Sequence, residues 1–280
     1  MSNAPIGVFD SGVGGLSILR GIRILLPGED VLFFADQGHV PYGPRPLDEV
    51  RRFSIGITRF LVDQGAKLIV VACNTASAAA LKELRAAFPA TPFVGMEPAV
   101  KPAAEQTLTR TVGVLATPAT FQGELFASVV ERFAQGVRVI PQTLPGLVER
   151  IEAGDLGGPA TQRILRDAVR PLMAQGADTL VLACTHYPLV IPAITEIAGP
   201  RVQVIDPSPA IARQTARLLD ERGLRATRDR QGQVTFLTSG DPARLRGMAL
   251  MLIGEVGKAR QVTWDSAGQA LRLPKDRAAV

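Results

Sequence analysis

The chain contains two stretches that repeat each other, and each includes one of its only two cysteines. Residues 65–75 read GAKLIVVACNT and residues 176–186 read GADTLVLACTH, so both start with Gly-Ala and continue as an apolar run to Ala-Cys. Valine-rich buried strands resemble one another by chance, but the shared ends favour an internal duplication. We therefore expect two similar halves, with Cys73 and Cys184 at equivalent positions.

A second pair of segments supports this duplication. Residues 6–11 (IGVFDS) resemble residues 112–117 (VGVLAT), and each lies upstream of a cysteine. The separation is 63 residues from Asp10 to the first cysteine and 68 residues from Ala116 to the second. Because the segments keep their order and nearly their spacing, the repeated unit spans more than one strand.

Short apolar runs alternate with helical patterns through both halves. Continuous apolar strands separated by helices are typical of a mostly parallel sheet covered on both faces. An apolar fraction of 46% and a charged fraction of 20% suit a packed core. We expect the α/β class, with two pseudo-symmetric doubly wound domains. The predicted strands are residues 5–9, 31–35, 67–72, 111–115, 137–140, 179–183 and 202–206, and the predicted helices are residues 14–26, 47–64, 76–87, 121–133, 160–175 and 190–198.

Polar and nucleophilic residues gather where the predicted strands end. In a parallel α/β sheet, ligands bind beyond the carboxyl ends of the strands. If the two halves face each other, the two cysteines face each other across the cleft. The residues at these strand ends are Asp10, Ser11, Asp36, Cys73, Asn74, Thr75, Thr117, Cys184, Thr185 and His186.

Paired cysteines suit the inversion of an α-carbon, which needs one base to remove a proton and an acid on the opposite face to return it. A free thiol has a pKa of about 8.5, and a helix N-terminus stabilises its thiolate, so a cysteine can serve in either form. Taken singly, a cysteine at the end of a buried strand is more often inert core. The matching positions of Cys73 and Cys184 favour catalysis.

The neighbours of the cysteines have a functional and a structural reading. Backbone amides at Ser11, Asn74, Thr75 and Thr185 can bind carboxylates, but Ser, Thr and Asn are also the common helix N-caps. His186 can shuttle protons to the adjacent thiol or serve the core. Similarly, Asp10 at a strand end can accept a substrate ammonium, tune Cys73 or cap the following helix.

Several classes of protein are disfavoured. The net charge is +5, but the basic residues are scattered and often stand beside acidic ones, so we expect no nucleic-acid partner. The Gly-rich segment 10–15 lacks the spacing of a dinucleotide or P-loop motif. Two cysteines cannot build a disulfide scaffold, and no apolar run is long enough to span a bilayer. We read no signal peptide and expect a cytoplasmic enzyme with no membrane partner.

Four motifs in this order resemble the glutamate racemases of the aspartate/glutamate racemase superfamily. The resemblance covers nearly the whole chain, up to the segment 234–241. The motifs are DSGVGGL at residues 10–16, Asp36 with PYG at 41–43, ACNTAS at 72–77, and ACTHYP at 183–188.

The resemblance implies a pseudo-symmetric pair of domains with the active site in the cleft between them. The implied first domain comprises residues 1–98 and 206–265, and the second comprises residues 99–205. Residues 266–280 have no clear match, and we expect a tail that is disordered. The resemblance also implies a homodimer.

The resemblance further implies interconversion of L- and D-glutamate for cell-wall precursor synthesis, with no pyridoxal phosphate or metal. Cys73 would act on D-glutamate and Cys184 on L-glutamate, assisted by Asp10, His186 and Glu152. Glu149 is the neighbouring candidate for the glutamate position. The implied substrate-binding residues are Asp10, Ser11, Pro41, Tyr42, Gly43, Asn74, Thr75, Thr117, Thr120, Thr185 and His186.

Three alternatives remain open from the residues. An aspartate racemase differs in substrate by one methylene, which a pocket discriminates by only about 1–3 kcal/mol. A zinc site could use Cys73, Cys184, His186 and Asp10, although close-spaced ligand pairs are missing. A binding protein on the same fold would need neither cysteine.

Overall fold

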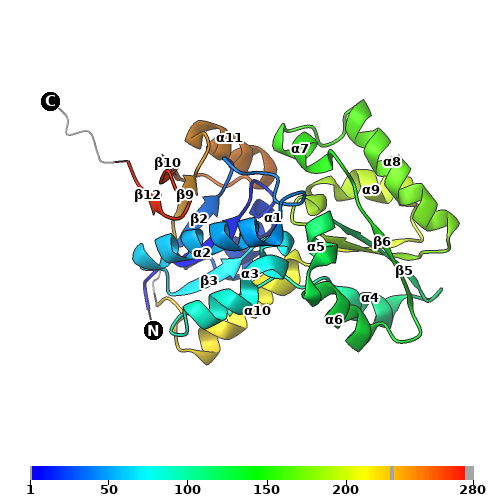
Figure 1. The fold of residues 1–280 in the computed structure, drawn as a ribbon, viewed down its shortest axis with the longest axis horizontal. Coiled ribbons are helices and arrows are strands. Elements are labelled where there is room, and N and C mark those ends of the chain that lie inside the picture. The colour runs from blue at the N-terminus through cyan, green and yellow to red at the C-terminus, as the bar shows by residue number, and fades with distance from the viewer. Residues whose placement is uncertain (1, 228–229, 275–280) are drawn as a thin grey trace.

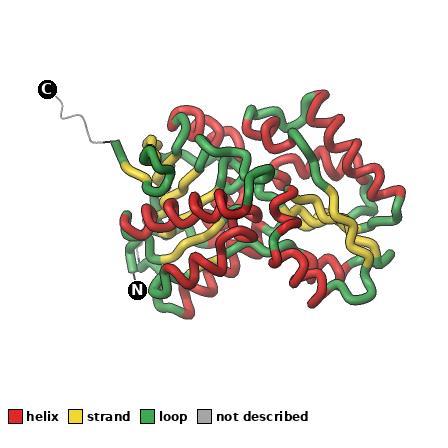
Figure 2. Tube along the Cα trace, in the orientation of Figure 1, coloured by secondary structure: helices red, strands yellow, loops and turns green. Residues whose placement is uncertain are grey.

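The computed structural model describes residues 2–227 and 230–274, and two parallel sheets organise this part of the chain. Figure 1 shows them side by side, each between layers of helices. The Cα trace in Figure 2 places the strands of both sheets inside the helical layers. This arrangement confirms the predicted α/β class.

The first sheet has the strand order β10-β9-β2-β1-β3-β4, with every neighbouring pair parallel. Strands β2 and β3 lie on either side of β1. Strands β9 and β10, from the C-terminal part of the chain, extend the sheet beyond β2. The strands are β1 (Ile6–Asp10), β2 (Val31–Ala35), β3 (Leu68–Val71), β4 (Phe93–Val94), β9 (Val234–Thr238) and β10 (Lys258–Gln261).

Alternate residues of these strands face opposite helical layers, as the two-residue period of a strand requires. Phe9 and Phe34 face one core cluster, whereas Val8 and Phe33 face the other. The first cluster packs on α2 (Leu47–Asp63) and α3 (Asn74–Ala87). The second packs on α1 (Leu16–Leu25), α10 (Ser208–Glu221) and α11 (Pro242–Ile253). The sheet is therefore doubly wound.

The second sheet repeats the centre of the first. Its order is β6-β5-β7-β8, again all parallel, and it matches β2-β1-β3-β4 strand for strand. The duplicated segments thus fall on β1 and β5 and on β3 and β7. The strands are β5 (Thr111–Ala116), β6 (Arg138–Gln142), β7 (Thr179–Ala183) and β8 (Gln203–Ile205).

Helices cover both faces of the second sheet as well. One face packs on α4 and α6, and the other on α7, α8 and α9. The core cluster on the latter face continues into the first half, so the two halves share apolar contacts. The exact domain boundaries stay a prediction. These helices are α4 (Val100–Gln106), α5 (Pro118–Gln122), α6 (Glu124–Phe133), α7 (Leu147–Glu152), α8 (Pro159–Ala174), the 3-10 turn Tyr187–Val190 and α9 (Ile191–Ala198).

The end of the chain differs from the expected tail. An antiparallel hairpin joins β11 (Thr263–Trp264) to β12 (Leu271–Arg272). The hairpin is held because Leu271 is buried in the same apolar cluster as Phe53. Residues 275–280 of the predicted tail lie outside the described residues. Within the described part of the chain, no helix is long and apolar enough to cross a membrane.

Candidate active site

One cavity lies where the carboxyl ends of the two sheets meet. Its lining combines residues from both halves, and it brings the two cysteines into one site. The lining residues are Ser11, Pro41, Tyr42, Gly43, Cys73, Asn74, Thr75, Thr117, Val148, Cys184, Thr185 and His186. All of these except Val148 were predicted from the sequence.

The cavity is small. The volume open to the centre of a water molecule is about 10 Å³, which is about what a single water needs. An amino acid is several times larger than water. Its entry therefore requires the surrounding side chains to move apart, which in a site between two halves means opening of the cleft.

Cys73 lies two residues after the end of β3 and caps α3. Its Sγ accepts a hydrogen bond from the Ala76 amide at 3.4 Å, as an N-cap side chain does. Burial raises the pKa of the Cys73 thiol well above its usual value, and the negative charge of Asp10 raises it further. The bond from Ala76 opposes this shift but does not cancel it. Cys73 is therefore a protonated thiol in this arrangement.

Cys184 occupies the equivalent position after β7 and has a different partner. Its Sγ lies 3.9 Å from Nδ1 of His186, and Nε2 of the same ring lies 2.7 Å from Oε1 of Glu152. Burial alone would lower the pKa of His186, but its bonds to Cys184 and Glu152 and the charge of Glu152 raise it well above 6.5. A protonated imidazole thus stands beside one thiol and not the other.

Glu152 lies behind His186 and outside the cavity lining. Burial works to raise its pKa, but the bond and charge of His186, the Val13 amide and Gln37 together lower it. The Val13 amide donates to Oε1 at 2.7 Å, and the Gln37 amide donates to Oε2 at 3.4 Å. Because Val13 and Gln37 belong to the first half, Glu152 connects the two halves. The alternative Glu149 is exposed.

Asp10 also lies behind the lining, at the end of β1. Its Oδ2 accepts the Gly15 amide at 2.8 Å just before α1, although Gly15 and not Asp10 is the N-cap residue of that helix. Its Oδ1 accepts the Thr185 hydroxyl at 3.3 Å from the other half. Burial raises the pKa of Asp10 against the charge of His186 and the bond from Gly15.

Three threonine hydroxyls meet at the opposite wall. Thr75 lies 2.9 Å from Thr117 and 3.4 Å from Thr120, and the latter two lie 3.0 Å apart. Thr120 supports the other two from behind rather than lining the cavity. Beside them, both polar atoms of the Asn74 side chain are buried without a hydrogen-bond partner. Unpaired buried polar atoms are costly, so this amide is suited to a polar ligand.

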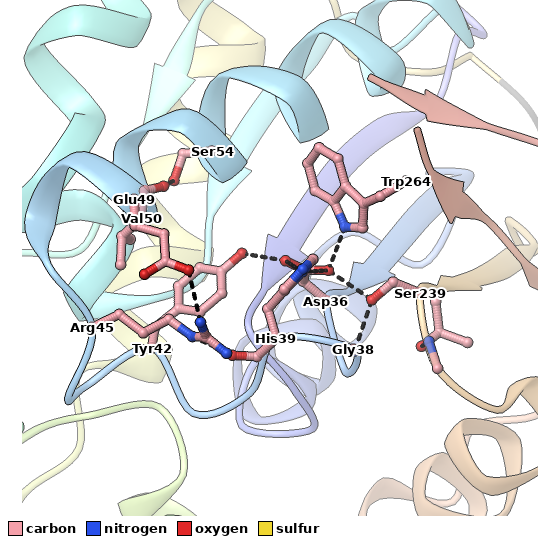
Figure 3. A network of polar contacts seen from close by, with 12 residues as sticks. Asp36, Gly38, His39, Tyr42, Arg45, Glu49, Val50, Ser54, Ser239 and Trp264 are labelled. Carbon is pink, nitrogen blue, oxygen red and sulfur yellow. Dashed lines mark hydrogen bonds and ion pairs between the residues drawn. The ribbon is translucent and has the colours of Figure 1, made fainter. Parts of the chain in front are cut away.

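The Pro41–Gly43 loop forms another wall, and the sequence did not reveal its support. The Tyr42 hydroxyl donates to Asp36 at 2.6 Å (Figure 3). His39, which precedes this loop, stacks on Phe53. Val148 was also missed. Its position four residues before Glu152 on α7 was the available signal, because residues four apart share a helix face.

A zinc site has no ligand set in the described residues. Within residues 2–227 and 230–274, no group of three or more His, Cys, Asp or Glu side chains is placed to hold a metal ion. The cavity instead combines two thiols, an imidazole, an amide and several hydroxyls. Such a set can exchange protons and bind a small charged molecule.

Comparison with known proteins gives consistent results. Residues 6–215 match the family described as Asp/Glu/Hydantoin racemase. The chain is 53% identical to the glutamate racemase of Roseiflexus sp. (strain RS-1), over 88% of this chain and 91% of that one. The Francisella tularensis glutamate racemase, solved with D-glutamate, superposes with a TM-score of 0.81 at 30% identity over 92% of this chain and 96% of that one. The Escherichia coli enzyme, solved with L-glutamate and the activator UDP-MurNAc-Ala, gives 0.78 at 31% identity over 92% and 97%.

Proposed function

Because the chain belongs to the Asp/Glu/Hydantoin racemase family and aligns with glutamate racemases over most of its length, we propose that it interconverts L- and D-glutamate without a cofactor. The observation that carries the mechanism is the placement of Cys73 and Cys184. They follow equivalent strands of the two halves and line one cavity. A substrate between them presents one face of its α-carbon to each thiol.

In the proposed starting state Cys184 is the base, because the His186 imidazole, whose pKa is raised, lies 3.9 Å from its Sγ, and Cys73, whose pKa burial raises, is the acid. With L-glutamate bound, the Cys184 thiolate removes the α-proton, and the electron pair of the broken C–H bond delocalises into the α-carboxyl group. Cys73 then gives its proton to the opposite face, forming D-glutamate and leaving a thiolate. The reverse reaction exchanges the two roles.

The polar walls hold the substrate during this exchange. Asn74 provides an unpaired amide, while Thr75, Thr117 and Thr185 provide hydroxyls within the lining. Amides at the start of α3 favour a carboxylate, because a helix N-terminus carries partial positive charge. Ser11 and the Pro41–Gly43 loop complete the enclosure. Asp10 acts from behind by orienting Thr185 and influencing Cys73.

The cellular role is proposed by analogy with the same relatives. We propose that the enzyme is cytoplasmic, works as a homodimer and supplies D-glutamate for peptidoglycan. The Escherichia coli relative was solved with UDP-MurNAc-Ala, which supports a link to the cell wall for that enzyme. A cross-linking or sedimentation measurement at micromolar protein tests the dimer, and a monomer at all concentrations contradicts it.

The first experiment follows exchange of the α-proton of L-glutamate, D-glutamate and L-aspartate in heavy water, with no added cofactor. We expect exchange with inversion for glutamate. Exchange with aspartate alone would move the function to an aspartate racemase, and no exchange with any substrate from folded, reduced protein would refute racemase activity. The variant lacking both thiols, Cys73→Ala with Cys184→Ala, measures the background.

Single variants test the two-thiol assignment. A glutamate with a chlorine atom on its β-carbon needs only one base. Loss of the α-proton and then of chloride gives an enamine, which water converts to 2-oxoglutarate and ammonium. Cys73→Ala should eliminate chloride from the L-isomer only, and Cys184→Ala from the D-isomer only. Neither variant should racemise glutamate. The opposite preference, or racemisation by either variant, refutes the assignment.

A further inference from the structure

The C-terminal hairpin lies against the helix that follows the substrate loop. The indole of Trp264 packs over Gly56 of α2, where an added Cβ would come within 2.6 Å of the ring. Its ring centroid is 5.6 Å from that of Phe53 and 5.7 Å from that of His39. Because Gly56 has no Cβ, the indole of Trp264 can pack against α2 and contact His39, which precedes the Pro41–Gly43 loop.

This indole also reaches a buried carboxylate. Trp264 Nε1 donates to Oδ1 of Asp36 at 2.9 Å, and the Ser239 hydroxyl donates to the same oxygen at 2.6 Å. The other oxygen accepts the Tyr42 hydroxyl at 2.6 Å and lies 3.0 Å from Nδ1 of His39. Figure 3 shows these side chains pointing at Asp36 from three separate segments. An indole N–H can only donate, so the direction of this bond is fixed.

The carboxylate has a direct effect on the cavity wall. Asp36 is fully buried, and a buried carboxylate needs several donors to remain in place. The Tyr42 hydroxyl donates a hydrogen bond to this carboxylate, and both neighbours of Tyr42 line the cavity. Gly43 in turn receives a hydrogen bond from the Ala119 amide at 3.2 Å and lies so close to Thr117 that a Cβ would come within 2.8 Å. The loop position thus sets how Thr117 is presented.

We propose that Trp264 is a positioning residue for glutamate binding, acting through Asp36 and Tyr42 on the Pro41–Gly43 loop. The proposal rests on the proposed function, since it needs glutamate as the ligand. Trp264 touches neither thiol, so it orders the binding wall and moves no proton. Its loss therefore weakens the binding of substrate and transition state alike.

The test compares steady-state racemisation by Trp264→Phe and by the wild type. Phenylalanine keeps a ring over Gly56 and removes the N–H donor. We expect KM for both enantiomers to rise by about tenfold while kcat stays within about twofold, because lost uniform binding appears in KM. The matched control is Thr263→Ala, the preceding exposed residue of β11, which should leave both constants unchanged.

An unchanged KM in folded Trp264→Phe overturns the proposal, as does a fall in kcat with KM unchanged. If that variant does not fold, Trp264→Leu asks the same question, because it also removes the indole N–H that donates to Oδ1 of Asp36. The same rise in KM is expected, and an unchanged KM overturns the proposal. A wild type that does not racemise glutamate refutes the proposed function, which is a separate outcome.

Discussion

The substitution Glu152→Gln isolates the charge of one buried side chain. Glutamine keeps the size of the residue and an oxygen that can accept from the Val13 amide and from His186. What it removes is the negative charge that offsets the cost of burying a protonated imidazole. We expect the pKa of His186 to fall, a smaller population of imidazolium beside Cys184 and a lower kcat for racemisation.

Glu152→Gln should also lower the free energy of unfolding. The size of this loss follows from the two hydrogen bonds that Glu152 accepts from the Val13 amide and from His186. A hydrogen bond to a charged group contributes about 1.5–3 kcal/mol and a neutral one about 0.5–1.5 kcal/mol, so neutralising the acceptor of two bonds costs about 2 kcal/mol in total. Full removal of the acceptor, as in Glu152→Ala, breaks the buried pair and costs about 3–5 kcal/mol.

The stability loss depends on pH with a definite sign. The folded-state pKa of His186 is raised, so its contribution is complete below its ordinary pKa of 6.5 and is lost as the pH rises through the folded value. The folded-state pKa of Glu152 is lowered, so its contribution is present above 4.5 and is lost as the pH falls through the folded value. The difference in the free energy of unfolding between the wild type and Glu152→Gln is therefore largest between pH 4.5 and pH 6.5.

Two measurements check this prediction. Urea unfolding at several pH values gives the free energy of unfolding, and NMR of ¹⁵N-labelled histidine follows the protonation of the ring. The chain has only His39 and His186, so both signals are resolvable and His39 is an internal reference. Exposed Glu149→Gln is the matched control. A His186 titration that is the same in wild type and Glu152→Gln would refute the reasoning.

Three further substitutions test other parts of the structure. Asn74→Ala should raise KM for glutamate about tenfold, since a bond to a charged ligand is worth about 1.5–3 kcal/mol, and an unchanged KM in racemisation assays would contradict the role of this amide. Lys67→Met leaves the Glu29 carboxylate, 2.6 Å away, buried without its ammonium, and urea unfolding should show a loss of about 3–5 kcal/mol. Gly14→Ala places a Cβ 2.5 Å from Nδ1 of His186 and 2.7 Å from its backbone nitrogen, so the melting temperature should fall, and a misplacement of about 1 Å at a catalytic group should lower kcat about a hundredfold.

The alternation of strands and helices and the pairing of the two thiols were predictable because they depend on local pattern and on duplication. Apolar strands that end on polar residues place those residues at one edge of a parallel sheet, whatever the details of packing. The repeat then placed Cys73 and Cys184 in register, and β1-β3 and β5-β7 occupy matching places in the two sheets.

The support around the site was not predictable because it joins residues far apart in the chain. Trp264 bonds to Asp36 across 228 residues, and Thr75 meets Thr117 across 42 residues. The periodicity of a strand or helix in the sequence cannot predict such contacts, because they depend on how the folded elements pack together. For the same reason the sequence suggested a disordered tail where Leu271 is in fact buried.

The hydrogen bonds across the cleft differ in strength, and this difference indicates how the cleft opens. On one side the Val13 amide donates to the Glu152 carboxylate, which is a charge-assisted bond, whereas on the other side Thr75 and Thr117 share a bond between neutral hydroxyls. Charge-assisted bonds are roughly twice as strong as neutral ones. Opening on the threonine side therefore costs less, and the hydroxyls released there regain partners when a substrate carboxylate arrives. We therefore expect the Glu152 side to serve as the pivot, so that His186 stays bonded to Glu152 and beside Cys184 while glutamate enters and leaves.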